Sequence, residues 1–190
     1  MPAKKRLAVL ISGRGSNMEA LLDATREEGY PAELVLVISD NPEAAGLQTA
    51  LNSDINTYAF TRSDYGSRDE HEAAISEVID NHTVDLVCLA GYMRILSPEL
   101  STRYSGRLIN IHPSLLPKFK GLDTHTRAIE AGESEHGCTV HYVNEEMDGG
   151  EIIAQSAIAV LPGDTPETLA ARVLVEEHKL YPRIVKELCN

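Results

Sequence analysis

Two polar side chains near the middle of the chain have the types and spacing that acyl-group chemistry needs. Asn110 and His112 lie two positions apart at the end of an apolar run, residues 108–111, that predicts a β-strand. Residues i and i+2 of a strand share one face, so the amide and the imidazole point the same way. Pro113 ends the strand because it cannot extend the hydrogen-bond ladder. Such a pair can stabilise a developing oxyanion and move a proton, although a histidine at a strand end is commonly structural.

A glycine-rich turn near the N-terminus has the composition of a phosphate site. Residues 13–17 read Gly-Arg-Gly-Ser-Asn and join an apolar run, 7–11, to a helical pattern. Ser16 and Glu19 have the spacing of a capping box, which predicts that Ser16 caps the helix. The free N–H groups and the dipole of a helix N-terminus attract an anion. The turn lacks the lysine of a Walker loop, and Met18 replaces the third glycine of a dinucleotide fingerprint. On its own it indicates a phosphate-bearing small molecule or a tight turn.

Asp148 and four histidines are weaker candidates. Asp148 precedes two glycines, a pattern typical of a turn, and a functional role would require a partner elsewhere in the chain. The spacing of the histidines does not complete a metal-binding triad. They are His125, His136, His141 and His178. We therefore expect no metal site.

The elements that must position these residues alternate between strands and helices. Continuous apolar runs indicate strands that are buried on both faces of a parallel sheet. They are residues 7–11, 34–38, 86–90 and 108–111, with a further short strand at 55–58. Helical patterns lie between them and begin near Ser16, Ser67 and Ser97.

The pattern changes after about residue 136. Residues 139–143 and 152–160 read as two strands, and the Asp-Gly-Gly at 148–150 between them is a hairpin signal. A long helix then opens at residues 164–167, and Pro182 is expected to kink or divide it. Its inner side is predicted to carry Leu169, Val173, Leu180, Ile184 and Leu188. The sequence therefore predicts an α/β fold, a single doubly wound and mostly parallel sheet with helices on both faces and an antiparallel edge near the C-terminus.

Composition narrows the class of protein. The 190-residue chain has 17 basic and 29 acidic side chains, a formal net charge of −12. An acidic balance disfavours a nucleic-acid partner, because such binders usually carry a basic face. No apolar run approaches the ~20 residues that span a bilayer. Three separated cysteines without a C-x-x-C pair suit a reducing compartment. We expect a cytoplasmic protein with no nucleic-acid or membrane partner.

Five segments in order resemble one enzyme family. They are residues 11–17, 90–97, 110–117, 136–141 with 148–150, and 176–182. This set resembles the glycinamide ribonucleotide formyltransferases, folate-dependent enzymes of purine biosynthesis, over nearly the whole chain. The resemblance implies a formyltransferase fold in one domain, residues 1–190, with a phosphate-binding half at about 1–100 and a folate-binding and catalytic half at about 101–190.

The resemblance also implies roles for individual residues. It implies that Asn110, His112 and Asp148 are catalytic. It implies that glycinamide ribonucleotide is bound by Gly15, Ser16, Asn17 and Glu177. It implies that folate is bound by Arg68, Met93, Arg94, Ile95, Leu96, Asn110 and Val143. Arg14 occupies a position that varies in the family.

The implied reaction moves the formyl group of 10-formyltetrahydrofolate to the amine of 5′-phosphoribosylglycinamide. His112 as imidazolium and the Asn110 amide would stabilise the negative oxygen, and a carboxylate such as Asp148 favours the charged imidazole. The expected partners are small molecules, and the expected assembly is a monomer or a homodimer.

Three rival functions remain. Methionyl-tRNA formyltransferases share the Asn-x-His motif but carry a second, RNA-contacting domain, which an acidic chain of 190 residues does not suggest. A formyltetrahydrofolate hydrolase would carry an N-terminal regulatory domain, whereas the first strand is expected at residue 7. A non-catalytic phosphometabolite-binding module would not need the Asn110, His112 and Asp148 set.

Overall fold

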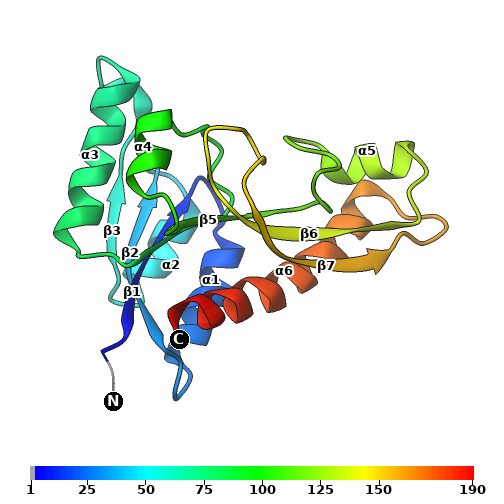
Figure 1. The fold of residues 1–190 in the computed structure, drawn as a ribbon, viewed down its shortest axis with the longest axis horizontal. Helices are drawn as coiled ribbons and strands as arrows, with labels where there is room; N and C mark the ends of the chain where they lie inside the picture. Colours follow the sequence, from blue (N-terminus) through cyan, green and yellow to red (C-terminus); the bar gives the residue numbers. More distant parts are fainter. Residues whose placement is uncertain (1–2) are drawn as a thin grey trace.

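A seven-stranded sheet organises the protein in a computed structural model that describes residues 3–190 (Figure 1). In chain order the strands are β1 (Lys5–Ile11), β2 (Ala32–Ser39), β3 (Asn56–Ala59), β4 (Leu86–Leu89), β5 (Leu108–His112), β6 (Glu135–Tyr142) and β7 (Ile152–Ala159). The helices are α1 (Ser16–Arg26), α2 (Ala45–Leu51), α3 (Arg68–Asn81), α4 (Pro98–Arg103), α5 (Thr124–Glu130) and α6 (Pro166–Cys189), with a 3-10 turn at Arg62–Asp64.

The strand order is β3-β2-β1-β4-β5-β6-β7. Strands β1 to β5 pair in parallel, whereas β6 and β7 are antiparallel to their neighbours. Figure 1 shows β6 and β7 extending beyond the parallel part of the sheet. This arrangement confirms the predicted fold class, a mostly parallel sheet with an antiparallel edge.

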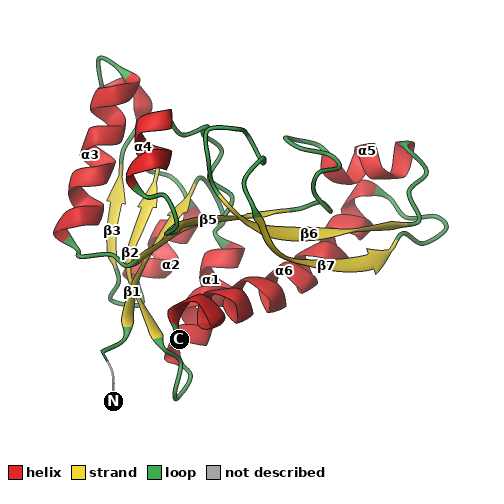
Figure 2. Ribbon diagram, viewed as in Figure 1, coloured by secondary structure: helices red, strands yellow, loops and turns green. Residues whose placement is uncertain are grey.

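Helices cover both faces of the sheet (Figure 2). One core packs α1, α2 and α6 against residues such as Val9 and Ile11, and the other packs α3 and α4 against Ala8 and Leu10. Alternate β1 residues therefore face opposite cores, and both sets are fully buried. The continuous apolar run at 7–11 has this physical cause. No helix within residues 3–190 is long and apolar enough to cross a membrane.

Helix α6 corrects two expectations. It continues through Pro182 without division. Leu188 was expected on the inner side but is 38% exposed, because the buried face continues instead through Val185 and Cys189. An apolar stripe that advances by three or four residues shifts gradually around a long helix. The buried positions of the last turn therefore cannot be extrapolated from those of the first turn.

The structure also corrects one local expectation and adds two helices. Gly15, in the left-handed conformation, is the N-cap of α1, and Ser16 is its first residue and makes no capping hydrogen bond. Strands β6 and β7 pair as the predicted antiparallel hairpin, and a wide loop, residues 143–151, connects them. Helices α2 and α5 were not anticipated, because neither has a side-chain N-cap that would mark its start.

Candidate functional site

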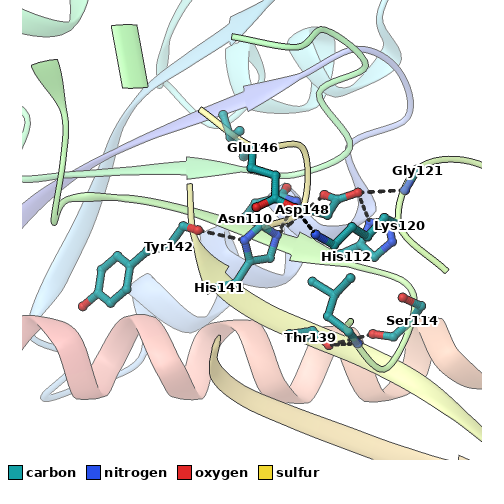
Figure 3. Close-up of polar contacts among 12 residues, drawn as sticks. Asn110, His112, Ser114, Lys120, Gly121, Thr139, His141, Tyr142, Glu146 and Asp148 are labelled. Carbon is teal, nitrogen blue, oxygen red and sulfur yellow. Dashed lines mark hydrogen bonds and ion pairs between the residues drawn. The ribbon is translucent and has the colours of Figure 1, made fainter. Parts of the chain in front are cut away.

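His112 lies at the carboxyl end of β5 with both ring nitrogens facing acceptors. Its Nε2 lies 2.9 Å from the carbonyl oxygen of Phe119, and its Nδ1 lies 3.5 Å from Oδ2 of Asp148. The side chain is 8% exposed. Two acceptors on opposite sides of the ring suit an imidazolium, which donates from both nitrogens. The structure thus brings His112 and Asp148 together across 36 positions of sequence, as Figure 3 shows.

Asp148 is held in place from the neighbouring loop. The Gly121 N–H donates to its Oδ2 at 2.9 Å, and its backbone has φ of 50°, in the left-handed region. Two residues earlier, Glu146 forms an ion pair with Lys120 at 2.5 Å. These contacts join loop 143–151 to the segment that follows Pro117 and fix the carboxylate beside the imidazole (Figure 3).

His141, which the sequence analysis considered only as a metal ligand, is a member of this cluster. In the β5–β6 pairing it stands opposite Asn110, whose Nδ2 lies 3.1 Å from the His141 Nε2. The His141 Nδ1–H donates to the carbonyl of Tyr142 at 2.8 Å, which leaves Nε2 as an acceptor for the Asn110 amide. Burial lowers the pKa of His141 and so favours the neutral ring. The alternation in residues 139–143 signalled a strand, but only the strand register shows that His141 faces Asn110.

The glycine-rich turn lines a cavity of about 300 Å³ between the ends of β1 and β4. Gly15 has φ of +78°, and a Cβ there would lie 3.1 Å from the Cα of Gly46. Asn17, which is 9% exposed, donates through Nδ2 to Oε2 of Glu177 at 2.6 Å. Its Oδ1 has no partner among the described residues. Asn17 of α1 therefore lines this cavity and connects it to Glu177 of α6.

Glu177 is a buried carboxyl group on the inner face of α6, 7% exposed. Burial raises its pKa, and the hydrogen bond from Asn17 opposes that rise. The structure thus joins two residues, 160 positions apart, that the family resemblance assigned to the same substrate.

The segment after β4 lies against the glycine-rich turn. The Met93 N–H donates to Oγ of Ser12 at 2.8 Å, and the Met93 and Ile95 side chains are 64% and 63% exposed. Arg68 donates to the carbonyl oxygen of Ile95 and pairs with Glu72 at 3.2 Å. The structure therefore shows Arg68 holding this segment from the side of α3.

The remaining expected folate residues differ in exposure and position. Arg94 is fixed by Asp40 at 2.7 Å, and Leu96 is buried in the core. Val143 donates its N–H to the carbonyl oxygen of Leu108, at the start of β5, and thus lies at the opposite end of this strand from His112. Within residues 3–190, no group of three or more His, Cys, Asp or Glu side chains could hold a metal ion.

Comparisons with known proteins agree with this geometry. The family model described as formyl transferase matches residues 5–185. The chain is 44% identical over 182 residues to phosphoribosylglycinamide formyltransferase of Haemophilus influenzae, covering 96% of this chain and 86% of that protein. It is 47% identical to the trifunctional purine biosynthetic protein adenosine-3 of Drosophila melanogaster but spans only 14% of that protein.

A solved structure shares the whole arrangement. The crystal structure of phosphoribosylglycinamide formyltransferase from Brucella melitensis is 52% identical in sequence, with a TM-score of 0.95, over 98% of this chain and 96% of that one. The family match, the identities and the shared fold lead to one conclusion: this chain belongs to the formyl transferase family.

Proposed function

We propose that this protein transfers the formyl group of 10-formyltetrahydrofolate to the amine of 5′-phosphoribosylglycinamide. The products are formylglycinamide ribonucleotide and tetrahydrofolate, in de novo purine biosynthesis. One observation carries the proposal. Strands β1, β4 and β5 are neighbours in the sheet, and their carboxyl ends carry the glycine-rich turn, the Met93 segment and His112 respectively. Ligands of open α/β sheets bind at this edge.

The ribonucleotide would bind at the glycine-rich turn. Its phosphate fits the N–H groups that open α1 at Gly15, Ser16 and Asn17. Its ribose hydroxyls would meet the unpartnered Oδ1 of Asn17 and the carboxyl group of Glu177. This placement extends the amine from the turn toward His112.

The folate would bind beside the segment formed by Met93, Arg94, Ile95 and Leu96. The exposed Met93 and Ile95 side chains offer apolar surface to a flat pterin ring, and the backbone offers polar groups for its edge. Arg68 keeps the segment in place through the Ile95 carbonyl, and Val143 and Asn110 bound the site on the β5 side.

The residues at the end of β5 would then serve the transfer. As the amine nitrogen bonds to the formyl carbon, the carbonyl electrons move to oxygen, and the donors there are the Asn110 amide and the His112 imidazolium. The electrons on oxygen then re-form the carbonyl, and the folate nitrogen leaves with the electrons of its bond to the formyl carbon. The proton that the attacking nitrogen gives up is transferred to the folate nitrogen. Asp148 would orient the imidazole and stabilise positive charge that develops on it, and His141, which accepts at Nε2, would orient the Asn110 amide.

A direct assay tests the proposal. The protein is mixed with 10-formyltetrahydrofolate and glycinamide ribonucleotide, and formylglycinamide ribonucleotide and tetrahydrofolate are measured. Equal amounts of the two products are expected, with none when the ribonucleotide is omitted. Release of formate without the ribonucleotide would indicate a hydrolase. Binding of both molecules without turnover would indicate a phosphometabolite-binding module.

We further propose that the enzyme acts in the cytoplasm as a monomer or a homodimer, without nucleic-acid or membrane partners. Its net charge of −12 supports the exclusion of polyanionic partners. Sedimentation of the protein at assay concentration would give the assembly.

A further inference from the structure

Arg14 is a cation at the glycine-rich turn without an assigned role. It lies between Gly13 and Gly15, its side chain is exposed, and it lines the cavity of about 300 Å³. It forms no hydrogen bond or ion pair within the described part of the chain, residues 3–190. Arg68 and Arg94, on the neighbouring segment, are both paired with carboxylates. The guanidinium of Arg14 therefore keeps its donors available.

Arg14 supplies the positive charge at the cavity beside the glycine-rich turn. It is the one charged side chain among the described residues that line the cavity. Burial lowers the pKa of nearby His178, which disfavours a second positive charge there; Glu19 opposes this shift and the Arg14 charge adds to it. In a chain with a net charge of −12, a cation beside the turn offsets the general repulsion of a dianion.

The turn itself is built to receive a ligand group. Asn17, nine-tenths buried, lines the same cavity and has an unpartnered Oδ1. The N–H groups at the start of an 11-residue helix open onto the same place. The backbone N–H groups attract an anion, but because they are neutral they discriminate weakly between one and two negative charges. A guanidinium adds a full charge and a planar fork that matches two phosphate oxygens.

We propose that Arg14 is a specificity-determining residue that binds the phosphate of the ribonucleotide substrate from the open side of the turn. The inference rests on the proposed function and adds to it a residue outside the set inferred from the family. Arg14 selects a phosphate monoester over its unphosphorylated ribosyl analogue. It acts on substrate affinity and leaves the formyl-transfer step unchanged.

The test compares three variants in steady-state kinetics. Arg14→Gln should raise KM for glycinamide ribonucleotide roughly 10-fold or more, the usual effect of losing a charged hydrogen bond, with kcat and the folate KM near wild type. Arg14→Lys should recover part of the affinity, since it keeps the charge but not the fork. Arg26→Gln is the matched control, because Arg26 lies in the last turn of the same helix. It should leave KM unchanged.

Salt and inorganic phosphate provide independent readouts. The wild-type ribonucleotide KM should rise with ionic strength, and that rise should be shallower in Arg14→Gln. Calorimetric titration with inorganic phosphate should show weaker binding to Arg14→Gln than to Arg26→Gln. Equal phosphate affinity and equal KM in these two variants would overturn the role of Arg14 while the formyl-transfer assay still stands. A wild type that forms no formylated product would overturn the proposed function, while phosphate titration still decides the role of Arg14.

Discussion

Asp148 contacts more of the cluster than its turn-like sequence suggested. Its two oxygens lie 3.5 Å from His112 and 3.7 Å from His141, and one accepts the Gly121 N–H. Its side chain is only 12% exposed. A residue that served only as a turn former would not need acidic character, because asparagine also tolerates the left-handed conformation.

Asp148→Asn separates charge from shape. The amide keeps the size and the turn preference but removes the charge that supports the His112 imidazolium, so turnover should fall at least ~10²-fold. The melting temperature should fall by no more than roughly 2–4 °C, the effect of about 1 kcal/mol in a chain of this size. Turnover and melting are measured beside His112→Asn and the double variant. The double variant should be little worse than the worse single one, because residues that act as a unit are not additive. Near-normal turnover in Asp148→Asn would contradict the catalytic role.

Glu177→Gln should raise the melting temperature and weaken binding of the ribonucleotide. Because burial raises the Glu177 pKa, the folded state holds this proton more tightly than the unfolded state. Stability therefore falls as pH rises above the unfolded carboxyl value of about 4.3. Glutamine can still accept from Asn17 and carries no charge, so melting at pH 8 should rise by roughly 2–4 °C. The gain should shrink as the pH approaches 4.5, and the ribonucleotide KM should increase. A gain that does not change with pH would contradict the buried-charge explanation.

Individual residues differ in how far the sequence reveals them. Asn110 and His112 could be paired because two positions on one strand share a face. His141 could not be added, because its position opposite Asn110 depends on the register of an antiparallel pair formed across 31 positions. The hold of Arg68 on the Ile95 carbonyl likewise depends on how α3 packs beside the Met93 segment.

At the scale of elements, the glycine-rich turn depends on a close approach of two backbones. A side chain at Gly15 must adopt φ of +78° and would meet the Gly46 Cα at 3.1 Å, whereas a Cβ at Gly13 meets nothing within 4 Å. Gly15→Ala should therefore cost about 1–2 kcal/mol of unfolding free energy, and Gly13→Ala less than about 0.5 kcal/mol. Urea unfolding of the two variants measures the difference. Equal stabilities would show that the turn relaxes to accept a side chain.

Elements with a continuous apolar run, an apolar stripe or a side-chain cap could be predicted from the sequence, and the two helices without these signals could not. The buried strands of the parallel sheet have continuous apolar runs, and α6 has both a capping box at Thr165 and a long apolar stripe. Helices α2 and α5 have seven residues each and no side-chain cap, so tertiary contacts decide them. The loop 143–151, which carries Asp148, is positioned by Gly121 and Lys120 from a distant segment.

At the scale of the whole molecule, buried histidines should control stability in mild acid. Burial is the largest cause that lowers the pKa of His136, to about 4, and it also lowers the pKa values of His125, His141 and His178. In the unfolded chain these groups take up protons near pH 6.5, so the unfolded state binds more protons between about 6.5 and 4. Stability should therefore be full above pH 6.5 and should be lost as the pH falls toward 4.

Protonation of ion-paired carboxylates should lower the free energy of unfolding in a different pH range. The effect of the histidines can therefore be measured separately. Asp85, whose pKa the Arg6 N–H holds below its usual value, destabilises the fold only at lower pH. The His136 shift corresponds to on the order of 3 kcal/mol. Urea unfolding at pH 7.5, 6.0, 5.0 and 4.5 should show a steep decline in wild type and in Asp85→Asn, and a shallower one in His136→Gln. An identical decline in all three proteins would assign acid sensitivity to groups other than His136.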